Sequence, residues 1–352
     1  MIRVVYNDLS VMKIAVIGAG GVGGYFGGRL AKAGFDVTFL ARGEHLREIQ
    51  KNGLRVKSVN GDFTIENAQA TDSIQKIGFA DIIILAVKAW QVRDIAKELS
   101  PIIRKDTIVL PLQNGVVTAE ELAEIIPEEN IIGGLCKIIS KVESPGVITH
   151  FALDPIVIFG EFSSRETRRA ELLKSVFDKA EVNSNISDDI TADLWKKFIA
   201  ICVSGLLAVT GTNYGELREL KETRKLMTEL IREIYALSQH LRINIEPEFP
   251  DKLISLIDTY PRETTSSLTR DVWEGRPSEI EYQNGTVVRL GEKYGVPTPV
   301  NRFVYNCILP MEIKARKKMA LNNAGRSLPD SSFYQQSRHP YKDPLLIRQP
   351  YE

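Results

Sequence analysis

The stretch that decides the fold is Lys13-Ile14-Ala15-Val16-Ile17-Gly18-Ala19-Gly20-Gly21-Val22-Gly23. A short apolar run is followed at once by a GxGxxG cluster, and a helix-like stretch continues to about residue 34. In this context the cluster is typical of a dinucleotide-binding turn. Gly18 allows the tight turn, Gly20 lets the backbone approach a pyrophosphate, and Gly23 lets the helix pack on the strand. We therefore predict that residues 18–23 bind dinucleotide phosphates at a helix N-terminus, the alternative being an ordinary glycine-rich turn.

Strand-like and helix-like segments alternate beyond this turn. Further buried strands are predicted at 36–40, 81–87 and 107–112, and another begins near 131–134. Such alternation indicates βαβ units and a parallel sheet. From residue 189 to about 320 helical periodicity dominates. We predict an α/β fold, with an N-terminal Rossmann-type doubly wound parallel sheet followed by an all-helical C-terminal domain. The expected divisions are an extension at 1–11, the dinucleotide-binding domain at 12–188, the helical domain at 189–320 and a loosely ordered tail at 321–352.

The composition excludes several classes of function. The 352 residues hold 45 Lys plus Arg and 45 Asp plus Glu, so no basic face for nucleic acid is indicated. Three scattered cysteines without a CxxC pair predict free thiols in a reducing compartment, with no zinc site or disulfide framework. No targeting segment is evident, and the longest apolar stretch, 198–209, is too short to span a bilayer. We therefore predict a cytoplasmic protein with no nucleic-acid, membrane or metal partner.

The end of the second predicted strand indicates which dinucleotide is bound. An NAD site usually has a carboxylate there, to accept from the ribose 2′-hydroxyl. Here the segment is Phe39-Leu40-Ala41-Arg42-Gly43. A guanidinium can hold a 2′-phosphate with two hydrogen bonds, so Arg42 predicts NADPH/NADP+ over NADH. Glu44 is a competing acid two residues on, and Arg42 as a solvated loop residue is the alternative.

With these features in view, the chain resembles the ketopantoate reductase (2-dehydropantoate 2-reductase) family over about residues 12–318. Five later segments carry the resemblance in order: Val87–Val92, Leu112–Gly115, Leu194–Lys197, Gly215–Leu217, and Ser266–Ser267 with Glu279–Gly285. The resemblance implies a Rossmann domain, an all-helical domain and an active site in the cleft between them. It also implies NADPH-dependent reduction of a 2-keto acid to a 2-hydroxy acid, in the route to pantothenate.

The resemblance also implies roles for individual residues. Lys197 would be the general acid, and Glu279 would hold the substrate hydroxyl. Ser267 would help to bind the substrate carboxylate. Asn114 and Lys88 would line the cofactor and substrate side, with Glu279 also beside the cofactor.

The residues themselves favour a lysine as proton donor. Hydride addition to a ketone builds negative charge on oxygen, so the site needs an acid and a positive field there. The four histidines are poorly placed, with His45 at the adenosine end of the cofactor site and His339 in the tail. Lys197 lies in a strongly apolar helix, and Lys196 is rotated by about 100° from it, so both cannot enter one cleft.

Each role has a plainer alternative. Lys197 could be a snorkelling lysine. On a helix Glu279 and Glu281 would point to different faces, so one would enter the cleft while the other is solvated, and either could instead be a surface carboxylate. Ser267 could be a helix or cap serine, and Asn114 part of an Asn-Gly turn.

The chain departs from the family pattern at three positions. Ile201 and Gly205 stand where the family has asparagines, four and eight residues after the lysine, and Thr264 replaces a third. Fewer polar contacts weaken selection for a small hydroxylated keto acid, and Gly205 is expected to leave room for a bulkier substrate. A non-catalytic NADP-binding regulator and a 3-hydroxy-acid dehydrogenase therefore stay open as alternatives. A homodimer also stays open, since long helices could bury a dimer face.

Overall fold

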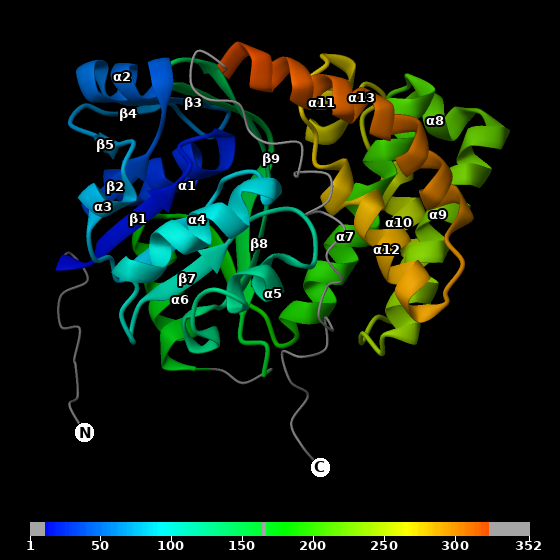
Figure 1. Ribbon diagram of the computed structural model, residues 1–352, viewed down its shortest axis with the longest axis horizontal. Coiled ribbons are helices and arrows are strands. Elements are labelled where there is room, and N and C mark those ends of the chain that lie inside the picture. Colours follow the sequence, from blue (N-terminus) through cyan, green and yellow to red (C-terminus); the bar gives the residue numbers. More distant parts are fainter. Residues whose placement is uncertain (1–10, 164–166, 324–352) are drawn as a thin grey trace. The chain divides into compact units, whose positions relative to one another are not determined.

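The computed structural model describes residues 11–163 and 167–323 (Figure 1). These residues form two compact units. The first comprises 11–113, 117–163 and 167–190, and the second comprises 114–116 and 191–323. Residues 1–10 of the expected extension and 324–352 of the expected tail lie outside the described residues.

The first unit is built on a parallel sheet with the strand order β5-β2-β1-β6-β7. Its strands are β1 (Lys13–Ile17), β2 (Asp36–Leu40), β5 (Gln69–Thr71), β6 (Ile82–Leu85) and β7 (Ile108–Pro111). The chain runs from β1 through β2 to β5, then returns to pair β6 with the other side of β1. This is the doubly wound order, and its switch point lies between β1 and β6. The predicted α/β fold is confirmed.

Helices cover this sheet because its strands are apolar on both faces. Ile14 and Val16 join a core with α1 (Gly21–Lys32) and α6 (Arg168–Lys179). Ala15 and Ile17 point the other way, into a second core. The helices on that side are α3 (Ile74–Ile77), α4 (Val92–Leu99) and α5 (Thr118–Ala123).

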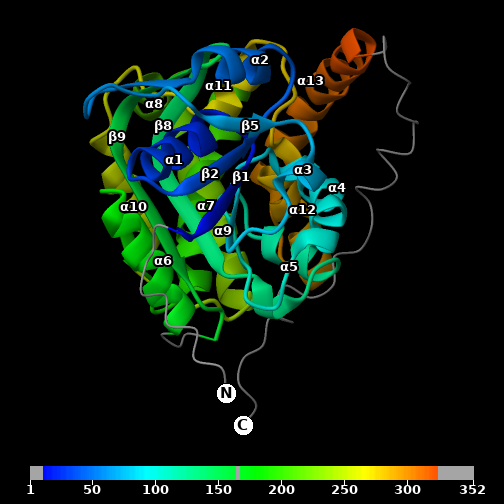
Figure 2. The ribbon, with the colours of Figure 1, turned by 90° about the vertical axis from the view of Figure 1, so that its left-hand side faces the viewer.

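A second sheet in the same unit was not predicted, apart from one strand start near 131–134. Its order is β10-β9-β3-β4, and β8 pairs antiparallel with β9. The strands are β3 (Leu54–Ser58), β4 (Phe63–Ile65), β8 (Gly133–Ser144), β9 (Val147–Gly160) and β10 (Asn183–Ile186). Helix α2 (Gly43–Asn52) leads from the first sheet into β3. Figure 2 shows β8 and β9 as long strands beside α1.

Glycines let α1 lie between the two sheets. A Cβ on Gly27 would stand 2.6 Å from Phe39 Cε1 and 2.8 Å from Val16 Cγ2, both in the first sheet. A Cβ on Gly24 would stand 2.6 Å from Ile148 Cγ1, in the second sheet. Side chains of ordinary size at these positions would force the layers apart. The GxGxxG cluster is thus the start of a longer run of glycines that serves packing on both faces.

Replacing a glycine within this sandwich should destabilise the protein. In Gly27→Ala the new methyl overlaps a ring and a methyl group that are both fully buried, and overpacking of this kind costs about 1–3 kcal/mol. Urea unfolding measures the loss. Gly20→Ala is the control, because Gly20 has an ordinary φ of −73° and a Cβ there meets nothing within 4 Å. Equal stability of the two variants would contradict this account of α1.

The second unit is helical, as predicted. Its helices are α7 (Ile190–Thr210), α8 (Tyr214–Glu219), α9 (Lys221–His240), α10 (Phe249–Asp258), α11 (Ser267–Trp273), α12 (Asn284–Tyr294) and α13 (Pro299–Asn323). The centre of α7, residues 202–208, is buried throughout and forms much of the unit's core. Among the described residues no helix has both the length and the apolar character to cross a membrane.

Candidate functional site

The glycine turn lies at the carboxyl end of β1, at the switch point of the sheet. Gly18 has φ +104°, which a side chain rarely tolerates, and a Cβ there would lie 3.0 Å from the backbone of Ala86, after β6. The N–H groups of Gly18 and Ala19 both donate to the Leu40 carbonyl, at 3.2 and 3.1 Å. The turn is therefore fixed to the ends of β2 and β6, the two strands that flank β1.

This turn fits the phosphates of a dinucleotide. Gly20 is the N-cap of α1, and no side chain caps the helix there. The first turn of α1 holds no acidic residue, so the positive end of the helix dipole is not neutralised locally. The Cβ direction of Gly20 is open space, which leaves room for a ligand to approach the backbone.

Gly20→Ala should separate binding from folding. The added methyl projects into the space beside the turn, so the dissociation constant for a nicotinamide dinucleotide should rise by about tenfold or more, which is roughly 1.4 kcal/mol. Fluorescence titration measures this change, and thermal unfolding should show an unchanged midpoint. Wild-type affinity in this variant would mean that the phosphates do not lie over Gly20.

Arg42 stands at the N-cap of α2, directly after β2. Its side chain is exposed and makes no ion pair with another described residue. Glu44, the competing acid, is bonded to Arg47 on the same helix. The guanidinium is therefore the unengaged charge at the tip of this strand.

Lys88 lies at the carboxyl end of β6, at the same sheet edge as the glycine turn. It precedes the short helix η2 (Ala89–Gln91) and is half-buried, with its ammonium 5.8 Å from the centre of the Trp90 ring. Ligands bind outside this edge in open α/β sheets, so the position suits a cofactor or substrate contact.

In the second unit, the structure brings together two of the predicted residues. Asn114 Nδ2 lies 3.4 Å from Glu279 Oε2, although the two are 165 positions apart in sequence. Gly115 has φ +113°, and a Cβ on it would stand 3.0 Å from the Tyr282 carbonyl oxygen. The Asn-Gly loop therefore packs on the segment that carries Glu279, and its glycine allows this approach.

The segment around Glu279 is held from α13. The Ser278 N–H and hydroxyl both donate to Glu312 Oε2, at 2.8 and 2.7 Å. Arg316 donates to the Ser278 carbonyl at 3.3 Å. Glu279 itself is only 6% exposed, and its carbonyl accepts from the N–H of Tyr282 at 3.0 Å. A buried carboxylate on a fixed backbone is suited to aligning a polar ligand group. Sequence reasoning missed Glu312, whose role depends on a contact across 34 positions.

The expectation for Glu279 and Glu281 was wrong in two respects. They do not lie on an α-helix, because Glu279 precedes the short 3₁₀ helix η5 (Ile280–Tyr282). Glu281 is not solvated either. It pairs with Arg289 at 2.8 Å and accepts from the Tyr305 hydroxyl at 2.7 Å. Glu281 is thus a structural partner of Arg289 and Tyr305.

Lys197 lies on α7 and is half-buried, and its sequence neighbours Trp195 and Phe198 are buried. On a helix, residues 197, 201 and 205 share one face. The far end of this face meets Asn284, whose side chain donates to the Cys202 carbonyl at 3.2 Å. The face of α7 that carries residues 197, 201 and 205 is therefore covered at its far end by Asn284. Asn284 is the first residue of α12 and comes five residues after Glu279 in the sequence.

Lys196 has a different environment. Its ammonium pairs with Glu246 Oε2 at 2.8 Å and lies 5.9 Å from the centre of the Phe249 ring. Lys196 is therefore already engaged in an ion pair on the surface of the second unit. Cys202 is fully buried, and burial raises the pKa of its thiol well above its usual value, so it is a packing group and no nucleophile.

The expectation that Gly205 leaves room for a bulkier substrate was wrong. Gly205 is buried, and a Cβ there would stand 2.4 Å from Asn284 Oδ1 and 2.7 Å from Val304 Cγ1. Asn284 fills the space and also donates to Asn301 Oδ1 at 2.9 Å. Of the two replaced asparagine positions on α7, only Ile201 is partly exposed.

Ser267 and Thr264 lie at the start of α11. Ser266, and not Ser267, is the N-cap that accepts from the Thr269 N–H at 3.1 Å. Ser267 is the first residue of the helix and is exposed, so its hydroxyl is accessible to a ligand. Thr264 is half-buried, and its carbonyl accepts from the Tyr214 N–H at 3.0 Å.

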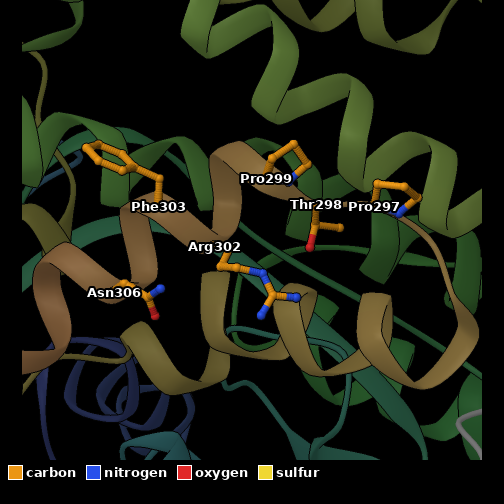
Figure 3. Close-up of a pocket in the computed structure, with 6 residues that line it drawn as sticks. All are labelled: Pro297, Thr298, Pro299, Arg302, Phe303 and Asn306. Carbon is orange, nitrogen blue, oxygen red and sulfur yellow. The ribbon is translucent and has the colours of Figure 1, made fainter.

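An open hollow of about 460 Å³ lies at the turn between α12 and α13. Figure 3 shows its lining residues, none of which belongs to the predicted site: Pro297, Thr298, Pro299, Arg302, Phe303 and Asn306. The guanidinium of Arg302 is paired with Glu292 at 2.5 Å. The hollow therefore offers no unengaged charge for catalysis. No group of three or more His, Cys, Asp or Glu in the described part of the chain is arranged to hold a metal.

Comparison with known proteins shows the family of both parts of the chain. Residues 14–164 match the family described as ketopantoate reductase PanE/ApbA, and residues 189–312 match its C-terminal domain. The chain belongs to the ketopantoate reductase family. The resemblance predicted from the motifs is thus confirmed. Members of this family are oxidoreductases that act on keto acids or the corresponding alcohols.

Individual relatives of this ketopantoate reductase family member span both units. A 2-dehydropantoate 2-reductase of Nostoc sp. (strain PCC 7120) is 32% identical over 301 residues, covering 84% of this chain and 93% of the relative. The structure of a PanE/ApbA family ketopantoate reductase from Ralstonia eutropha JMP134 matches with a TM-score of 0.80 and 29% identity, over 87% of this chain and all of the other. D-mandelate dehydrogenase with NADH and anilino(oxo)acetate matches with a TM-score of 0.79 and 26% identity, over 87% of this chain and 99% of the other.

Proposed function

We propose that this protein reduces a 2-keto acid to a 2-hydroxy acid, using NADPH. The observation that carries the proposal is the contact between Asn114 and Glu279, which joins two separately predicted site segments in a chain of this family. The bound cofactor supplies a hydride to the keto carbon. The chain must then supply a proton and a positive field to the keto oxygen.

Lys197 is the proposed proton donor. Its ammonium stabilises the negative charge that develops on the substrate oxygen and gives that oxygen a proton, so that keto acid, hydride and proton yield the hydroxy acid. Glu279 accepts a hydrogen bond from the substrate hydroxyl, and Asn114 orients the Glu279 carboxylate. Ser267 donates to the substrate carboxylate. Lys88, after the carboxyl end of β6, is the proposed contact for the cofactor.

Replacing Lys197 with Ala should reduce turnover by at least about a hundredfold, because general acid catalysis is lost. The dissociation constant for NADPH should change little. Lys196→Ala is the matched control, since its ammonium is already paired with Glu246. Steady-state oxidation of NADPH with a keto acid measures the effect. Similar turnover in the two variants would reject Lys197 as the donor.

We propose that Arg42 selects NADPH by binding its 2′-phosphate. The guanidinium is exposed at the strand tip, and the nearby acid is held by Arg47. Arg42→Ala should lower the preference for NADPH over NADH by about ten- to a hundredfold, the worth of hydrogen bonds to a charged group. The ratio of kcat/KM for the two dinucleotides measures this. Lys51→Ala removes the same charge from the other end of α2 and should leave the ratio unchanged.

The substrate is either ketopantoate or a more apolar 2-keto acid. Ile201 favours the second, because an apolar group replaces an amide on the lysine face of α7. Similarity to D-mandelate dehydrogenase favours it too, since mandelate is a 2-hydroxy acid with an aryl group. A panel that includes ketopantoate and phenylglyoxylate discriminates between them by kcat/KM. Binding of NADPH without turnover of any acid would instead indicate a non-catalytic regulator.

A further inference from the structure

His45 joins two parts of the first unit through both of its ring nitrogens. Nε2 lies 2.7 Å from the Ala19 carbonyl oxygen, and Nδ1 lies 3.0 Å from the Gly146 nitrogen. A backbone N–H can only donate, so Nδ1 must accept from Gly146 and cannot carry a proton. The proton of the neutral ring is therefore on Nε2, which donates to Ala19. Burial lowers the pKa of His45, in keeping with a neutral ring, although the bond to Ala19 acts in the opposite direction.

One end of this bridge is the glycine turn. The Ala19 carbonyl and the Gly20 N–H belong to the same peptide plane, and the described residues contain no cis peptide bond. In a trans peptide the C=O and N–H point in opposite directions. A hydrogen bond that holds the Ala19 carbonyl towards α2 therefore directs the Gly20 N–H away from α2. Gly20 is the residue whose Cβ direction is open.

The other end is the tight turn between β8 and β9. Gly146 has φ +75°, and its carbonyl accepts from the Arg55 N–H in β3 at 2.9 Å. A Cβ on Gly146 would stand 3.1 Å from Glu48 Cβ, so the turn lies against α2. The second sheet thus provides a fixed point for the His45 ring. Because the ring also bonds to Ala19, it links the glycine turn of the first sheet to this fixed point.

We propose that His45 is a positioning residue for the dinucleotide: its Nε2–H fixes the peptide between Ala19 and Gly20 so that the Gly20 N–H faces the pyrophosphate. This inference rests on the proposed use of a dinucleotide. It assigns the two ring nitrogens different tasks. The bond from Nε2 orients the binding turn, whereas the bond to Nδ1 holds the ring and the β8–β9 turn in place.

Two amide variants separate these tasks. In His45→Gln the longer side chain places an amide N–H near the former Nε2 and can donate to Ala19. In His45→Asn the amide oxygen occupies the former Nδ1 position and can accept from Gly146, but the side chain does not reach Ala19. The dissociation constant for NADPH is measured with the full chain by fluorescence titration, below the melting temperature of each variant. Gln50→Ala, which removes a bond from α2 to the Ala70 carbonyl, is the control on the same helix.

The expected result is that His45→Asn weakens NADPH binding by about tenfold, the worth of one hydrogen bond, while His45→Gln and Gln50→Ala stay within about threefold of wild type. Thermal midpoints measured without nucleotide show whether stability follows the same order. A purely structural histidine would give affinities that track stability, and equal affinities of the Asn and Gln variants would overturn the inference. If wild type does not bind NADPH, the proposed function fails as well, so the two failures are distinguishable.

Discussion

The first unit depends on the close packing of α1 between two sheets. The layers can approach only where α1 presents backbone to them, and Gly24 and Gly27 provide this on opposite faces. The same helix begins at the glycine turn, so its N-terminus is directed to the edge where β1 and β6 end. One packing constraint therefore sets both the layer spacing and the direction of the N–H groups that would meet an anion.

In the second unit, buried hydrogen bonds fix the positions of the helix starts and of the Glu279 segment. Glu233 accepts from the N–H groups of Val300 and Asn301 at 2.8 and 3.0 Å, and so caps the start of α13 from α9. Asn301 in turn bonds to Asn284 at the start of α12. Together with the Glu312 contact to Ser278, these bonds hold the Glu279 segment at both ends. Such bonds are directional, so they fix orientation more sharply than apolar contacts do.

The sequence predicted the elements whose signal is local. The apolar strand Ile82–Leu85, the glycine turn and the helical second half could all be predicted, because each is encoded in consecutive residues. The second sheet was missed, since β8 and β9 are partly exposed and β3 pairs with β9 across about ninety positions. The motifs that indicated the family also named Asn114 and Glu279. Their contact, and the support from Glu312, could not be predicted, because they depend on how distant segments pack.

The crowding at Gly205 has an evolutionary consequence. A larger residue cannot fit at this position while Asn284 and Val304 keep their present places, so substitutions at the three sites are expected not to be additive. A single substitution there would meet a barrier that a double or triple change avoids. When substrate preference is altered by stepwise substitutions on α7, Ile201 should therefore be changed first. Gly205 should be changed only after Asn284 and Val304 have been replaced by smaller residues.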